Sequence, residues 1–192
     1  NEYAYLETPV TKVLVAPYDA KQIYMAQISN LDKKYDPAIE PIRALYDEYF
    51  GGGMNSIVFQ EMRETRGLAY SAWASIMPPS YLKYPYVLRT QIATQNDKMI
   101  DAVTTFNDII NNMPESEAAF KLAKDGLTNR LRTERIIKGD IIWSYINAQD
   151  LGQNVDPRIK LYNDIQNMSL KDIVDFQKQW VKGRTYVYCI LG

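Results

Sequence analysis

The feature that most constrains the fold is a change of hydrophobic period at Gly67. Before it, Ile57, Phe59 and Met62 are apolar positions of a helical segment that we expect from about Asn55 to Arg66. Gly67 then occupies the position after the helix, where a left-handed residue is favoured. After it, apolar and polar residues alternate through the segment 70–76, as they do in a half-buried strand. The chain must therefore combine helix and sheet within one folded unit.

Other segments extend this sheet. Residues 86–94 alternate in the same way, and Pro78-Pro79 separates them from the strand at 70–76, which predicts an antiparallel pair. Two further strands are expected at 13–15 and 23–28, and a closing strand at 185–191.

The remaining segments show the helical period. The first of these helices follows Asp36-Pro37, although Pro41 leaves its start uncertain by one turn, and Gly51-Gly52-Gly53 ends it. Later helices are predicted over 99–110, 116–131, 141–151, 157–165 and 169–182, the last opening on a capping-box pattern. We predict an α+β fold, with a mostly antiparallel sheet and helices packed on one face. Residues 13–192 form a single domain, and residues 1–12 are a linker or domain edge.

Composition excludes several classes of function. The chain of 192 residues contains no histidine and one cysteine, Cys189, and 22 basic residues against 23 acidic ones give a net charge of −1. Without histidine, the usual general base and the commonest metal ligand are missing, so we expect no metal site, no cofactor and no catalytic residue in this fragment alone. The balanced charge argues against nucleic acid as a partner.

The ends of the chain indicate a piece of a longer protein. It begins at Asn1, and its first methionine is Met25, inside a strand-like pattern. A signal peptide or partner domain would lie outside it. No segment approaches the roughly 20 apolar residues of a membrane-spanning helix, so no membrane segment is expected. One cysteine is compatible with the cytoplasm and with the cell envelope, which leaves the localisation unknown.

The glycine run Gly51, Gly52 and Gly53 invites comparison with phosphate-binding loops. It lacks the following Lys-Ser or Lys-Thr of a P-loop, and it follows a helix rather than a strand, unlike the dinucleotide fingerprint. We interpret it as a turn between two helices, where glycine lets the backbone pass close to another segment.

The densest cluster of chemistry-bearing side chains lies between Glu61 and Tyr70. Because Gly67 ends the helix, Arg63 is expected in its last turn and Tyr70 at the start of the next strand, at one end of the sheet. A guanidinium and a phenol placed there could bind a carbonyl, a carboxylate or a developing oxyanion without any base. Alternatively, Arg63 pairs with a nearby acid or the helix C-terminus, and Tyr70 belongs to the core.

The stretch from Tyr49 to Ser71, YFGGGMNSIVFQEMRETRGLAYS, resembles the hallmark segment of the non-zinc domain in the pitrilysin family of zinc metallopeptidases. Looser similarity extends over the whole chain. Members of that family pair similar α+β domains around a peptide, and one of these domains carries the zinc motif H-x-x-E-H. Since this chain has no histidine, the resemblance implies the C-terminal partner domain.

The resemblance further implies that Arg63 and Tyr70 hydrogen-bond peptide substrate near the scissile bond. Zinc would then belong to a separate domain, in the same chain or in a homologous subunit. The full-length protein would be a zinc metalloendopeptidase, and the fragment alone would be inactive. Two other functions stay open: a non-catalytic scaffold of the same fold, like the respiratory core proteins, and an isolated module that binds a ligand of its own.

Overall fold

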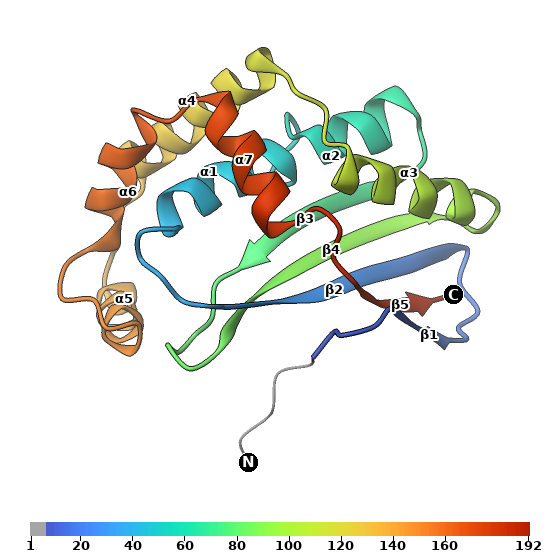
Figure 1. The fold of residues 1–192 in the computed structure, drawn as a ribbon, viewed down its shortest axis with the longest axis horizontal. Helices are drawn as coiled ribbons and strands as arrows, with labels where there is room; N and C mark the ends of the chain where they lie inside the picture. Colours follow the sequence, from blue (N-terminus) through green and yellow to red (C-terminus); the bar gives the residue numbers. More distant parts are fainter. Residues whose placement is uncertain (1–6) are drawn as a thin grey trace.

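A computed structural model describes residues 7–192, and it combines a five-stranded sheet with a layer of helices (Figure 1). The strands are β1 (Lys12–Ala16), β2 (Gln22–Lys34), β3 (Ser71–Met77), β4 (Pro85–Gln95) and β5 (Val187–Leu191). The helices are α1 (Glu40–Phe50), α2 (Ile57–Phe59), the π-helix η1 (Gln60–Thr65), the 3₁₀-helix η2 (Asn96–Lys98), α3 (Met99–Asn111), α4 (Glu117–Thr133), α5 (Gly139–Asp150), α6 (Pro157–Ile165) and α7 (Leu170–Trp180). The first six residues of the expected 1–12 linker lie outside the described residues.

The sheet has the order β1-β5-β2-β4-β3. Three of its pairings are antiparallel, β2 with β4, β2 with β5 and β3 with β4, and only β1 and β5 run parallel. The predicted antiparallel pair is β3 and β4, in which Trp73 lies opposite Gln91. The mostly antiparallel α+β fold is therefore confirmed, with β1 and β3 as its two edges.

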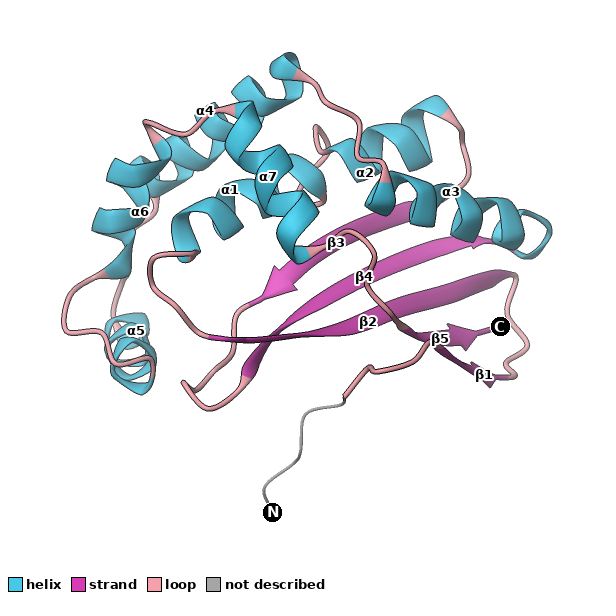
Figure 2. Ribbon diagram, viewed as in Figure 1, coloured by secondary structure: helices cyan, strands magenta, loops and turns pink. Residues whose placement is uncertain are grey.

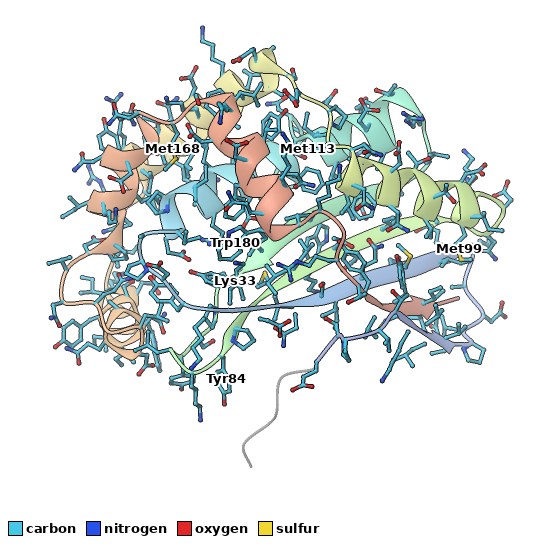
Figure 3. The ribbon with its side chains drawn as sticks, in the orientation of Figure 1. Lys33, Tyr84, Met99, Met113, Met168 and Trp180 are labelled. Carbon is cyan, nitrogen blue, oxygen red and sulfur yellow. The ribbon has the colours of Figure 1, made fainter. Side chains whose placement is uncertain are left out.

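Helices cover one face of the sheet (Figure 2). The sheet contributes alternate residues to the core beneath them; in β3 these are Ala72, Ala74 and Ile76. Aromatic rings fill the space below α7, where Trp180 stacks on Phe176 with ring centroids 5.0 Å apart. Figure 3 shows Trp180 at the sheet-facing end of α7, and the Lys33 ammonium lies 5.0 Å from its ring centroid.

Two apolar surfaces lie outside this core. Helix α5 is set apart beneath α6 (Figure 1), and none of its residues is buried. The segment 137–146 exposes a group of large apolar side chains: Ile137, Ile141, Ile142, Trp143, Tyr145 and Ile146. On the other side of the domain, the helix-free face of the sheet carries half-buried Trp73 together with exposed Tyr24 and Met77. Within the described residues, nothing covers either surface.

Two helix boundaries differ from the sequence expectation. Helix α1 starts at Glu40, one turn after Asp36-Pro37, with Pro41 in its first turn, because the Asp36 side chain accepts a bond from Ala38 N in a separate turn. The segment expected as one helix up to Arg66 changes at Gln60 from α-helix to π-helix. Single π-turns of this kind occur often at functional sites.

The outer edge of β3 is partly closed by α1. The Asp47 carboxylate accepts a hydrogen bond of 2.8 Å from Ile76 N, and Arg43 donates to the Ile76 carbonyl at 3.1 Å. Arg43 and Asp47 are also paired at 2.7 Å. An unpaired edge strand invites another strand to add to it, and these two side chains occupy the backbone groups of Ile76 that such a strand would need.

Candidate functional site

The π-helix η1 and the turn after it place Arg63 at one end of the sheet. Gly67 has φ +57°, the left-handed conformation expected from the sequence. The amides of Leu68 and Ala69 both donate to the Met62 carbonyl, at 2.8 and 3.2 Å, which folds the chain sharply back toward β3. Arg63 therefore lies in the last turn of the helical segment, as predicted.

Tyr70 immediately precedes β3, and the strand beside it fixes its backbone. Its amide donates to the Ala93 carbonyl of β4 at 2.8 Å. Two neighbours hold the preceding turn: Thr94 Oγ1 donates to the Leu68 carbonyl at 2.5 Å, and Lys98 Nζ donates to the Gly67 carbonyl at 3.1 Å. The backbone of the loop is thus tied to β4 and η2, whereas the Tyr70 hydroxyl makes no hydrogen bond with the described residues.

The side chains of Arg63 and Tyr70 lie together. The guanidinium carbon is 5.8 Å from the centroid of the Tyr70 ring and 5.0 Å from that of Phe59. Arg63 Nε lies 3.6 Å from Glu64 Oε1, its one ion pair among the described residues. Tyr70 is 71% exposed, so it is not the core residue that the alternative interpretation required.

Both groups keep unused hydrogen-bonding capacity. The Arg63 guanidinium makes no hydrogen bond with the described residues, and neither does the Tyr70 hydroxyl. The N–H groups of Arg63 and the O–H of Tyr70 are therefore available to a ligand. A guanidinium fork beside a phenol can bind a carbonyl or carboxylate oxygen, and it favours negative charge that develops there. This pair cannot abstract a proton from water by itself, since it contains no carboxylate or imidazole base.

The glycine run is a packing feature. A Cβ on Gly51 would lie 2.2 Å from the carbonyl oxygen of Ala74 in β3, so only glycine allows α1 to end against that strand. A Cβ on Gly52 would lie 2.8 Å from the Asp47 carbonyl, and Gly53 is open. This agrees with the interpretation of the run as a turn that passes close to another segment.

The larger hollows of the described surface lie away from Arg63 and Tyr70. One of about 370 Å³ lies on the helix-free face of the sheet and is lined by Leu14, Tyr24 and Cys189, among others. A second of about 370 Å³ lies beside α5 and the start of α6. Neither is lined by Arg63 or Tyr70, so this pair lies outside both hollows.

The described residues show neither a metal-binding cluster nor a membrane-spanning helix. Residues 7–192 contain no group of three or more acidic or cysteine side chains that could hold a metal ion. The helices in that range are all too short or too polar to cross a membrane.

Sequence reasoning assigned Phe59 only to the apolar side of a helix and missed its contact with Arg63. The signal was present, because residues four apart on a helix are neighbours. The tie from Lys98 to Gly67 was missed as well, and no spacing rule brings together two positions so far apart in the chain.

Comparison with known proteins identifies a family for this chain. A family model described as "Peptidase M16 inactive domain" matches residues 12–127. The comparison with curated proteins gave no match.

Solved structures share the fold at low sequence identity. A peptidase M16 inactive domain from Pseudomonas fluorescens aligns with a TM-score of 0.78 and 14% identity, over 100% of this chain and 45% of that one. A protease from Helicobacter pylori aligns with a TM-score of 0.75 and 13% identity, over 100% and 48%. A conserved protein from Enterococcus faecalis V583 aligns with a TM-score of 0.74 and 16% identity, over 97% and 43%.

The chain therefore spans less than half the length of these three structures. The family model covers more than half of the chain, and the resemblance to the non-zinc domain of the pitrilysin family is confirmed. The chain belongs to the family of peptidase M16 inactive domains.

Proposed function

We propose that this domain binds peptide for a zinc-dependent metalloendopeptidase, with Arg63 and Tyr70 holding the peptide opposite a zinc site in another domain. One observation carries the proposal. Arg63 and Tyr70 stand side by side, with the guanidinium 5.8 Å from the ring, and neither side chain makes a hydrogen bond among the described residues. A phenol that is 71% exposed, beside a guanidinium whose terminal nitrogens make no hydrogen bond with the described residues, is arranged for a ligand rather than for packing.

The proposed chemistry of this domain is hydrogen bonding without proton transfer. The guanidinium N–H groups and the phenolic O–H would donate to backbone carbonyl oxygens of an extended peptide. As a carbonyl near the cleaved bond gains negative charge, both contacts would strengthen, and such differential binding lowers the barrier. The residues of this chain do not fit a zinc ion, since histidine is absent and the described acidic residues form no metal-binding group.

The partner in this proposal is a zinc-bearing domain, in the same chain or in a homologous subunit. The two uncovered apolar surfaces support it. Helix α5 has no buried residue, and the helix-free face of the sheet exposes Tyr24 and Met77. Exposed apolar patches of this kind mark interaction surfaces in soluble proteins.

The occupied edge of β3 argues against one mode of peptide binding, the addition of the peptide as a further strand. Arg43 and Asp47 already occupy the backbone groups of Ile76, and Gly51 lies against Ala74. Strand addition along this part of β3 would have to displace α1. We therefore assign the grip on the peptide to the side chains of Arg63 and Tyr70.

The test is peptide hydrolysis by the full-length protein carrying Tyr70→Phe. Loss of one donor to a developing oxyanion typically lowers kcat by about 10² to 10³. The thermal midpoint should stay unchanged, because the Tyr70 hydroxyl has no partner among the described residues to lose. Tyr81→Phe is the matched control, since Tyr81 is 48% exposed in the loop between β3 and β4, at the other end of the sheet.

Arg63→Ala provides a second, independent measurement. It should lower kcat/KM as well, and its effect should not add fully to that of Tyr70→Phe if both side chains hold one peptide. Hydrolysis unchanged in both variants would contradict the proposal. The domain would then have the scaffold function that the family resemblance leaves open.

A further inference from the structure

Phe59 is a large aromatic residue that the core does not account for. Its neighbours Ile57 and Val58 are buried and belong to the hydrophobic core, whereas Phe59 is half-buried and lies outside that cluster. The contact of its ring is instead with Arg63, whose guanidinium carbon lies 5.0 Å from the ring centroid. The partly buried Phe59 ring thus presents its face to the Arg63 cation.

We infer that Phe59 is a positioning residue for Arg63: it holds the guanidinium beside Tyr70 so that both groups meet the peptide together. This inference rests on the proposed function of the pair. Three contacts surround the guanidinium, with Phe59 at 5.0 Å, Tyr70 at 5.8 Å and Glu64 at 3.6 Å from Nε. Glu64 approaches Nε, the inner nitrogen, so the two terminal nitrogens remain available.

The physical reason is rotamer freedom. An arginine whose side chain is 46% exposed has many conformations, and a ligand that needs one of them must pay for ordering it. A ring beneath the guanidinium favours the bound-like conformation in advance through cation–π attraction. The backbone gives the same support to Tyr70, whose amide is fixed to Ala93 at 2.8 Å. Arg63 has no backbone tie at its guanidinium, where Phe59 and Glu64 are the groups that can order it.

The neighbouring arginine supplies a comparison within the same segment. Arg66 Nε lies 3.4 Å from Glu61 Oε2, and the structure places no aromatic ring against its guanidinium within the described residues. Both arginines therefore have an acidic partner, but only Arg63 is held by rings. The arginine that contacts aromatic rings is thus the same one that lies beside Tyr70.

The experiment compares Phe59→Leu with Phe59→Tyr in the full-length protein. Leucine keeps an apolar side chain but removes the π face, whereas tyrosine keeps both. We expect Phe59→Leu to lower kcat/KM for peptide hydrolysis by about 5- to 30-fold, which is less than the effect of losing a donor directly. Phe59→Tyr should keep kcat/KM at the wild-type value. In an Arg63→Gln background, Phe59→Leu should have no further effect. Met54→Ala, which removes an apolar side chain that is 73% exposed in the turn before α2, is the control.

A second readout does not depend on hydrolysis. The ¹⁵N relaxation of Arg63 Nε reports how ordered the guanidinium is on the picosecond to nanosecond timescale. Its order parameter should fall in Phe59→Leu and stay high in Phe59→Tyr, while that of Arg66 should change in neither. An Arg63 order parameter that is equal in wild type and Phe59→Leu overturns the inference.

The two proposals fail in different ways. If Arg63→Gln lowers hydrolysis and Phe59→Leu does not, the positioning by Phe59 is wrong and the binding function of Arg63 stands. If Arg63→Gln leaves hydrolysis unchanged, the proposed function is wrong, and the relaxation measurement still decides whether Phe59 orders the guanidinium.

Discussion

Gly51→Ala should be one of the most damaging single substitutions in this domain. Gly51 follows α1 with φ −140° and ψ 0°, so it does not need the left-handed backbone, and the cost of a side chain there arises mainly from contact. The new Cβ would lie 2.2 Å from the Ala74 oxygen and 2.5 Å from the Ala74 nitrogen. Both are backbone atoms of a paired strand, which cannot rotate away. The end of α1 would have to move outward by about an ångström to reach ordinary van der Waals contact.

The magnitude follows from what that movement disturbs. Overpacking of this kind costs about 1–3 kcal/mol. The shift also loosens the contacts of α1 with Ile76, where Asp47 accepts at 2.8 Å and Arg43 donates at 3.1 Å. Leaving a buried backbone group without its partner adds about 1–3 kcal/mol. We expect a total loss of about 3 to 5 kcal/mol, or roughly 6 to 20 °C in the thermal midpoint of a domain of this size.

Gly53→Ala is the matched control, two residues further along the same turn. Its nearest atom would be Glu48 Oε1 at 4.0 Å, and Gly53 is not among the glycines with positive φ. Removing a glycine without strain stabilises a protein by about 0.4–1 kcal/mol through the unfolded state. Calorimetry of both variants should therefore give shifts of opposite sign. A Gly51→Ala midpoint equal to that of Gly53→Ala would refute the packing argument.

Two further predictions concern the Arg43–Asp47 ion pair of α1, which lies against β3, and the uncovered helix α5. Burial raises the pKa of Asp47 to about 6 despite the opposing charge of Arg43, so the folded state keeps a proton that the unfolded state releases near pH 4. Its stabilising contribution is then present below pH 4 and is lost as the pH rises to about 6, a change of about 3 kcal/mol. Denaturant unfolding should show this slope in the wild type, and Asp47→Asn should remove it; an identical slope in both would contradict it. In the full-length protein, Ile142→Lys should lower the thermal midpoint by several degrees if a partner covers α5, because an unpaired charge would be buried. Leu122→Lys on α4 should have little effect, and equal midpoints for both would argue that α5 faces water.

Much of the fold could be predicted because its signals are local. The alternation in β3 and β4 and the glycine after η1 each lie within one short segment. The capping box at Ser169 is equally local, and the structure shows both of its hydrogen bonds with Asp172. The sequence left the start of α1 uncertain by one helical turn, because Asp36-Pro37 and Pro41 are both acceptable beginnings for a helix. Periodicity does not choose between two adequate caps.

The unpredicted features depend on contacts between distant segments. The parallel pairing of β1 with β5 joins the two ends of the chain, as in the register of Leu14 with Cys189. The π-turn at Gln60 is a change in hydrogen-bond partner that leaves no trace in apolar spacing. The closure of the β3 edge by Arg43 and Asp47 likewise requires knowing that α1 crosses that strand. Such features are decided by packing, and a pattern along one segment does not encode them.

The candidate site and α5 show the same limit. The sequence predicted that Arg63 and Tyr70 would share one end of the sheet, because Gly67 fixes the turn between them. It also predicted the helix that carries Ile142. An apolar stripe indicates that a face needs cover, but it does not say whether the same chain provides it. In this domain the chain leaves both Ile142 and Tyr70 exposed, at 63% and 71%. The proposed second domain would account for both exposed groups only if it reaches α5 as well as the Arg63–Tyr70 pair at the other end of the sheet.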